Sequence, residues 1–124
     1  MPANSGTNLR QYPLLSTTVE VPVGSEPAQY IAVTLDGTTS ATNACGVSNA
    51  SRDGFVTVVL NGYMPCKVKN GQTIAKGASV ASDANGELIV ATALTGALGV
   101  ALESVTVANN EYIEIFVNPR PVLA

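Results

Sequence analysis

The sequence predicts an all-β protein, a small barrel- or sandwich-like domain of short strands with an extended N-terminal arm. Apolar runs recur roughly every 8–12 residues, and turns rich in Gly, Asn and Asp separate them. Helical periodicity is weak, because the best candidate, residues 92–102, contains Gly96 and Gly99. The 124 residues favour a single domain that can bury its own core.

Residues 1–18 are expected to form an arm ahead of the main domain. Residues 1–8 are polar and turn-forming, and the apolar cluster after them shows neither helical nor alternating periodicity. A disordered terminus and an arm that orders on a partner are both compatible with this composition. In the second case the candidate contact residues are Leu9, Arg10, Tyr12, Leu14 and Leu15.

Two strands are predicted in the region after the arm. Residues 18–23 alternate between apolar and other side chains, and Pro22 makes this an edge strand because proline lacks a ladder donor. Residues 30–35 form the second strand, which Asp36-Gly37 ends in a hairpin turn. The small polar residues that follow are compatible with a loop or with a weak exposed strand.

The remaining strands follow from further apolar runs and turns. They are predicted over residues 55–60, 63–68, 79–81, 88–91, 99–102 and 112–117. Asn61-Gly62 is expected to turn the chain between the first two, and residues 83–86 to close a hairpin. The main domain therefore spans residues 19–118, and a tail over residues 119–124 follows.

The second half of the chain repeats a pattern of the first half. Residues 44–48 resemble residues 97–101, and residues 55–61 resemble residues 112–118. Both copies read Gly-Val, a loop, then an aromatic residue, an apolar strand and Asn. A structural repeat would make each half one supersecondary unit that closes its core on the other half. Chance likeness between Val- and Gly-rich strands is the alternative.

The chain is poor in charge. It is 46% hydrophobic and 12% charged, about half of the usual charged share of about 25%. Part of the surface is therefore expected to be covered by a partner or by copies of the same chain. The net charge of −3 and a single close basic pair, Lys67 and Lys69, argue against a nucleic-acid partner. No apolar run is long enough to span a bilayer and no signal pattern opens the chain, so we expect no membrane partner and synthesis in the cytoplasm.

No residue pattern points to catalysis, a metal or a cofactor. The absence of His excludes Ser-His-Asp, Cys-His and His-metal arrangements. Asp36, Asp53 and Asp83 lie near Gly or Asn and are interpreted as turn formers, not as carboxylates for glycoside hydrolysis. The tract after Asp83 is too short for a calcium loop. Cys45 and Cys66 are expected to be buried free thiols, although their spacing leaves a disulfide open.

The second half contains, in this order, the motifs at residues 74–80 (IAKGASV), 83–86 (DANG), 97–102 (ALGVAL) and 112–117 (YIEIFV). This order of motifs resembles the capsid decoration (cement) proteins of tailed bacteriophages and, more distantly, the lambda-type head decoration proteins. The resemblance covers roughly residues 60–118, with a weaker copy over residues 24–61.

This resemblance implies a small β-barrel-like structural protein, commonly a homotrimer, on the exterior of the virion capsid. There it would bridge subunits of the major capsid protein and stabilise the shell. Decoration proteins commonly extend an N-terminal arm along the capsid. Residues 1–23 match no family pattern, so the arm is assigned here from composition alone.

Two other functions remain open at this point. A phage-borne host-surface or glycan-binding module would need a cleft with exposed aromatic side chains. Residues 71–80 are also similar to lipoyl- or biotinyl-type carrier domains, which attach their group to a lysine at a hairpin tip. Here Lys76 precedes Gly77 and the later turn contains no lysine, which argues against a carrier.

Overall fold

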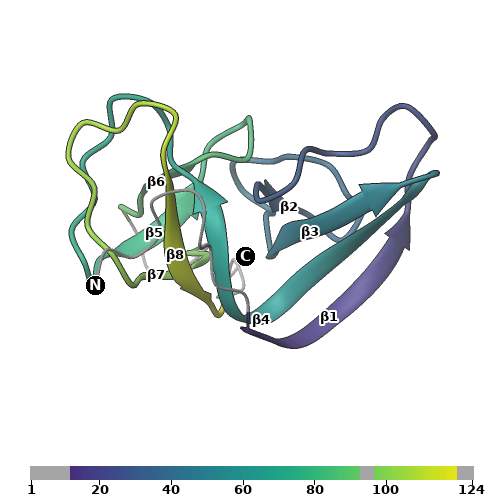
Figure 1. Cartoon of the computed structure of the whole chain (residues 1–124), viewed down its shortest axis with the longest axis horizontal. Helices are drawn as coiled ribbons and strands as arrows, with labels where there is room; N and C mark the ends of the chain where they lie inside the picture. The colour runs from purple at the N-terminus through teal and green to yellow at the C-terminus, as the bar shows by residue number, and fades with distance from the viewer. Residues whose placement is uncertain (1–11, 93–96, 120–124) are drawn as a thin grey trace.

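The computed structural model describes residues 12–92 and 97–119, and this part of the chain forms eight β-strands and no helix (Figure 1). The all-β prediction is therefore confirmed. The strands are β1 (Tyr12–Glu20), β2 (Ala32–Val33), β3 (Gly46–Arg52), β4 (Phe55–Lys67), β5 (Ser79–Ser82), β6 (Leu88–Val90), β7 (Gly99–Ala101) and β8 (Tyr112–Val117).

All eight strands belong to one sheet, and β4 is its central element. The strand order is β2-β3-β4-β8-β7-β5-β6, with β1 paired to β4 outside this path. Every strand pair is antiparallel. On one edge β4 pairs first with β3 and then with β8, while β1 runs along its other edge. The sheet therefore curls into a nearly closed barrel (Figure 1).

The expected turn at Asn61-Gly62 is wrong, because the chain continues through it as part of β4. Gly62 pairs with Pro13 on one side and with Val117 on the other, so cross-strand bonds hold this position in the sheet. Its φ of 130° lies outside the range that other residues readily adopt. Glycine therefore supplies a bend within a long strand, and Figure 1 shows β4 changing direction sharply along its length.

A parallel bridge between Val68, just after β4, and Leu88 in β6 closes the second half of the sheet. The N–H of Lys69 donates to the carbonyl of Leu88 at 3.0 Å. Lys67 Nζ lies 3.2 Å from Glu87 Oε2 across the same seam. These contacts join β6 to the end of β4, so β4, β8, β7, β5 and β6 enclose a small barrel.

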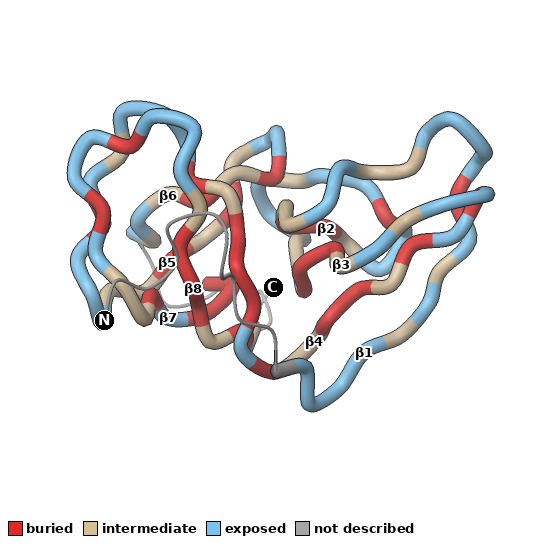
Figure 2. The backbone as a smooth tube through the Cα atoms, viewed as in Figure 1, coloured by how far each residue is buried: buried red, intermediate tan, exposed pale blue. Residues whose placement is uncertain are grey.

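Two apolar clusters fill the interior. The larger one lies inside the second-half barrel, and its largest fully buried side chains are Met64, Ile74, Leu88, Leu98 and Ile115. The smaller one lies under β1 and the first half of β4 and contains Val21, Val33, Val56 and Val58. Burial of each such side chain contributes about 1.5–3 kcal/mol. Figure 2 shows the buried segments following β4, β8 and the short strands beside them.

Strand bounds in the first half differ from those predicted. The first strand is β1, which begins six residues before the predicted residue 18 and ends before Pro22. Its full length pairs with β4, and this distant partner is invisible to local periodicity. The second strand shrinks from residues 30–35 to Ala32–Val33, because Tyr30 has a φ of 64° and a turn follows at once. No helix forms in the described parts of residues 92–102, where β7 lies.

The predicted internal repeat is confirmed by the strand registers. We call residues 16–61 the first unit and residues 63–118 the second unit. In the first unit β1 pairs with the first part of β4. In the second unit the second part of β4 takes the place of β1 and pairs with β8. Corresponding pairs are Ser16–Val59 with Tyr63–Phe116, and Glu20–Phe55 with Lys67–Tyr112. The β2–β3 pair Val33–Gly46 corresponds to the β5–β7 pair Val80–Gly99.

Backbone hydrogen bonds outside the strands repeat as well. The bond from Val21 N to Gly54 O (2.7 Å) corresponds to that from Val68 N to Glu111 O (2.8 Å). The bond from Tyr30 N to Ser48 O corresponds to that from Gly77 N to Ala101 O, and both are 2.8 Å long. The bond from Cys45 N to Val33 O (2.9 Å) corresponds to that from Leu98 N to Val80 O (2.8 Å). Tyr30 and Gly77 share positive φ values of 64° and 90°. The two halves are thus copies of one β-unit, joined where β4 passes from the first to the second.

The first unit lacks a strand that corresponds to β6. The turn after β2 lies directly against the smaller cluster, since a Cβ on Gly37 would be 2.5 Å from Val21 Cγ1. At the free edge of β2, Ala32 N donates to Gly86 O in the β5–β6 turn at 2.8 Å. Pro22 occupies the position that corresponds to Lys69 in the second unit. Because proline has no N–H, the first unit has no counterpart of the bond from Lys69 N to Leu88 O that closes the small barrel.

Candidate interaction surface

The structure places Leu14 and Leu15 on the surface of β1, where Leu14 is 72% exposed and Leu15 is 58% exposed. The pairing register shifts on both sides of Leu15, which interrupts the usual alternation of side chains between the two faces. Both leucines therefore remain outside the core. Tyr12 begins β1 opposite Tyr63, and the other two candidates, Leu9 and Arg10, lie outside the described residues. Residues 12–18 of the predicted arm are part of the sheet.

The outer edge of β1 carries backbone groups that point away from β4. Val21, just after β1, donates to Gly54, and bonding direction alternates along an antiparallel strand. Thr18 and Glu20 therefore direct their N–H and C=O groups outward. Among the described residues, no strand pairs with this edge. The edge has no lysine, and its only charge is Glu20, so charge gives it little protection against strand addition. Pro13 and the irregular register at Leu15 interrupt the edge only near the start of β1.

Phe55, the first residue of β4, lies at one end of the outward face formed by β1, β4 and β3. Its neighbours across the ladders are Glu20 on β1 and Arg52 on β3. The residue is 49% exposed, because Val56 and Val58 take the inward positions of β4. An open depression of about 330 Å³ adjoins it and is lined by Ala50, Ser51, Arg52, Phe55 and Thr57.

The corresponding face of the second unit is covered. Tyr112, the counterpart of Phe55, is half-buried, and the ring of Tyr30 meets it edge-on at 6.2 Å between centroids. Pro65 and Glu114, the counterparts of Thr18 and Thr57, are buried. The same β-unit thus presents a covered face in one copy and an open face in the other.

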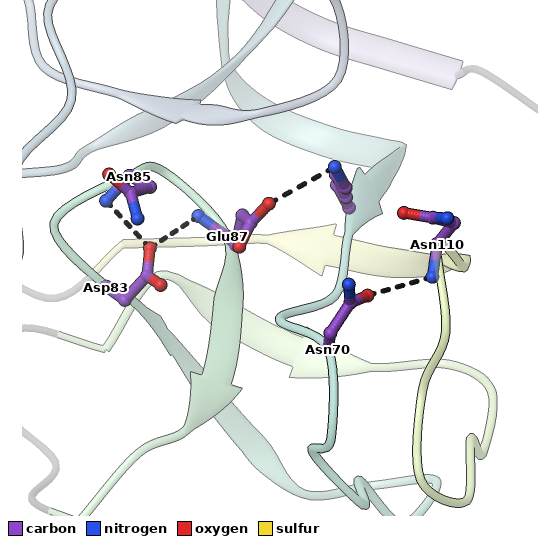
Figure 3. A network of polar contacts seen from close by, with 6 residues as sticks. Asn70, Asp83, Asn85, Glu87 and Asn110 are labelled. Atoms are coloured by element: carbon purple, nitrogen blue, oxygen red, sulfur yellow. Dashed lines mark hydrogen bonds and ion pairs between the residues drawn. The ribbon is translucent and has the colours of Figure 1, made fainter.

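The Asp83 segment forms a hairpin turn, as predicted. Asp83 Oδ1 accepts hydrogen bonds from the N–H groups of Asn85 (2.8 Å) and Glu87 (2.9 Å), and Figure 3 shows the carboxylate turned into the loop. In the neighbouring loops Asn70 Oδ1 accepts from Asn110 N at 2.9 Å. These side chains hold backbone turns together. Within the described residues, no group of three or more His, Cys, Asp or Glu is placed to hold a metal.

Both cysteines are free thiols. Cys66 is fully buried in the larger cluster, and desolvation raises the pKa of its thiol strongly. Cys45 is only partly buried, which corrects the prediction of two buried thiols, and burial raises its pKa as well. Neither thiol has the lowered pKa of a reactive nucleophile.

Comparisons with known proteins give no family for this chain. No protein-family model matches it, and no curated protein is significantly similar. Across residues 12–92 and 97–119, no helix is long and apolar enough to cross a membrane.

Sequence reasoning missed the role of Glu20 and Phe55 in the open face. Both residues belong to predicted strands, and their exposure depends on the pairing of β1 with β4, which the sequence does not reveal. The internal repeat was the available signal, since it aligns Phe55 with Tyr112.

Proposed function

We propose that this protein decorates the exterior of a tailed-phage capsid, as a homotrimer, and stabilises the shell by bridging subunits of the major capsid protein. The observation that carries the proposal is β1, an edge strand with an open side and two exposed leucines. An extended segment of a capsid subunit could add to the part of this edge that precedes Glu20 through backbone hydrogen bonds, with the leucines as apolar anchors.

The composition supports a binding role of this kind. A chain in which only 12% of the residues are charged is suited to contacts with a protein lattice. Each contact can be weak, because several sites per trimer act together at a high effective concentration. The β-barrel fold and the motif order in residues 74–117 are compatible with the decoration proteins that the sequence resembles.

The test is co-sedimentation with capsids from which the protein has been stripped. Replacing Leu14 and Leu15 together by Thr keeps β-propensity and removes apolar contact area, so we expect binding to weaken roughly 10- to 30-fold. Leu35→Thr is the matched control, because Leu35 is 55% exposed in the turn after β2. Unchanged capsid binding by the Leu14/Leu15 double variant, with its fold intact, would contradict the proposal.

A shortened chain that begins at Tyr12 tests the remaining arm candidates, Leu9 and Arg10. It keeps the whole of β1, whereas removal of residues 1–18 would also take most of a strand from the sheet. Loss of capsid binding in this chain would assign the contact to residues 1–11.

A phage-borne glycan-binding module is the second candidate. The depression beside Phe55 favours it, because it combines one aromatic ring with Arg52 and two hydroxyl side chains. Phe55→Ala would then abolish binding to a glycan array while leaving capsid binding unchanged.

A further inference from the structure

Within one chain, the first unit covers an edge of the second. The N–H of Lys67, on the outer edge of β4, donates to the carbonyl oxygen of Tyr30 at 2.9 Å. The positive φ of Tyr30 sets the direction of this carbonyl. The Tyr30 ring then lies against Tyr112, the residue that pairs with Lys67 in the ladder.

The internal repeat supplies the two halves of this contact a second time, a receiving edge and a docking carbonyl, which we call half-sites. Among residues 12–92 and 97–119, no strand and no backbone hydrogen bond occupies these second copies. Glu20 corresponds to Lys67 and Phe55 to Tyr112, so the receiving edge is the exposed one on β1 and β4. Gly77 corresponds to Tyr30. Its N–H donates to Ala101 O as that of Tyr30 donates to Ser48 O, and its φ is 90°. Gly77 is exposed, and a Cβ built on it would meet no atom within 4 Å.

We propose that a second copy of this chain completes these half-sites. The turn at Lys76 and Gly77 of one copy docks on the β1–β4 edge of the next, as the Tyr30 segment docks on Lys67 within a chain. The carbonyl of Gly77 accepts a hydrogen bond from the N–H of Glu20. The fit includes charge, because the exposed Lys76 ammonium faces the exposed Glu20 carboxylate.

The exposed ring of Phe55 favours the binding of a second copy at this edge. Its counterpart Tyr112 is covered by the Tyr30 ring, but Gly77 has no side chain to offer. The aliphatic stem of Lys76 can lie over the Phe55 ring and bring the ammonium group toward Glu20. This contact shields an aromatic residue that is 49% exposed in the isolated chain.

The contact joins different surfaces of the two copies, so each copy gives one half-site and receives another. Such head-to-tail association closes into a ring or extends as a chain. It does not depend on capsid binding and can be measured on the purified full-length protein.

The first experiment exchanges the charges and follows mass by light scattering over a concentration series. We expect assemblies that are multiples of the 12.7 kDa chain. Glu20→Lys and Lys76→Glu should each weaken association roughly 3- to 10-fold, and the two changes in one chain should restore it. Glu111→Lys and Lys69→Glu are matched controls at exposed positions and should leave the mass unchanged. A monomer at every concentration, or charge variants that associate like the controls, would overturn the proposal.

The second experiment identifies the surfaces in contact. Glu20→Cys in one protein and Lys76→Cys in another, each with Cys45→Ser, are mixed under mild oxidation. Because each protein carries only one new thiol, a disulfide between the new thiols must join two chains. The mixed disulfide should form well before either homodimer. Predominance of the Glu20→Cys homodimer would indicate symmetric β1–β1 pairing and would refute the head-to-tail arrangement.

Discussion

Gly46 and Gly99 hold corresponding places in the two units, and alanine at either place should destabilise the fold strongly. A Cβ on Gly46 would lie 2.5 Å from the carbonyl oxygen of Val59 and 2.5 Å from Val58 Cγ1. A Cβ on Gly99 would overlap the carbonyl oxygen of Phe116, the counterpart of Val59. In both cases the obstacle is the backbone of the neighbouring strand, which cannot move aside by a simple rotamer change.

The magnitude follows from the displacement required. Ordinary contact begins near 3.4 Å, so β3 and β4 must separate by about 0.9 Å to accept Gly46→Ala. Overpacking of this kind costs about 1–3 kcal/mol, and each ladder hydrogen bond lost nearby adds about 1 kcal/mol. Reduced entropy of the unfolded chain returns about 0.4–1 kcal/mol. We expect a net loss of about 2–4 kcal/mol for Gly46→Ala, and at least as much for Gly99→Ala.

Urea unfolding followed by circular dichroism measures these losses. Val100→Ala is the control, because Val100 follows Gly99 but is 38% exposed on the outer face of β7. It should change the free energy of unfolding by less than about 1 kcal/mol. Gly46→Ala or Gly99→Ala within 1 kcal/mol of the parent protein would refute the close approach of the strands. A large loss at only one of the two sites would show that the units pack differently.

Two further predictions concern titration and thiol access. The N–H groups of Gly54 and Gly24 hydrogen-bond the Glu26 carboxylate and lower its pKa, so its contribution to stability is complete above the ordinary pKa and is lost as pH falls through the lowered one. Glu26→Gln should therefore flatten the acid limb of a stability–pH curve, and an unchanged limb would contradict this. Cys45 should react slowly with a thiol reagent in the native protein and Cys66 only after unfolding, as mass spectrometry of labelled peptides would show. Equal labelling rates in the native state would contradict the burial of Cys66.

Local patterns were sufficient to predict several parts of this fold. The alternation in residues 112–117 and the turn at Asp83 produced a strand and a hairpin where they were expected. The all-β class followed from the same patterns. The internal repeat was visible as two Gly-Val pairs, because each glycine is required by the close approach of a neighbouring strand.

The open face and the candidate anchors could be predicted only in part. Leu14 and Leu15 were identified from composition, but their place in a sheet depends on pairing with β4, far away in the sequence. The same pairing made Asn61-Gly62 a bend instead of a turn. Pairings between distant strands are selected by the packing of the whole barrel, and no local pattern encodes them.

The sequence by itself determined which segments can be strands, since side-chain alternation and turn residues act over a few neighbouring positions. Only the tertiary structure decided that one unit covers its partner's edge through Tyr30 while Glu20 and Phe55 stay open. The physical reason is that exposure belongs to a surface made by several strands together. The residues next to it in the sequence do not determine which distant segments cover a side chain.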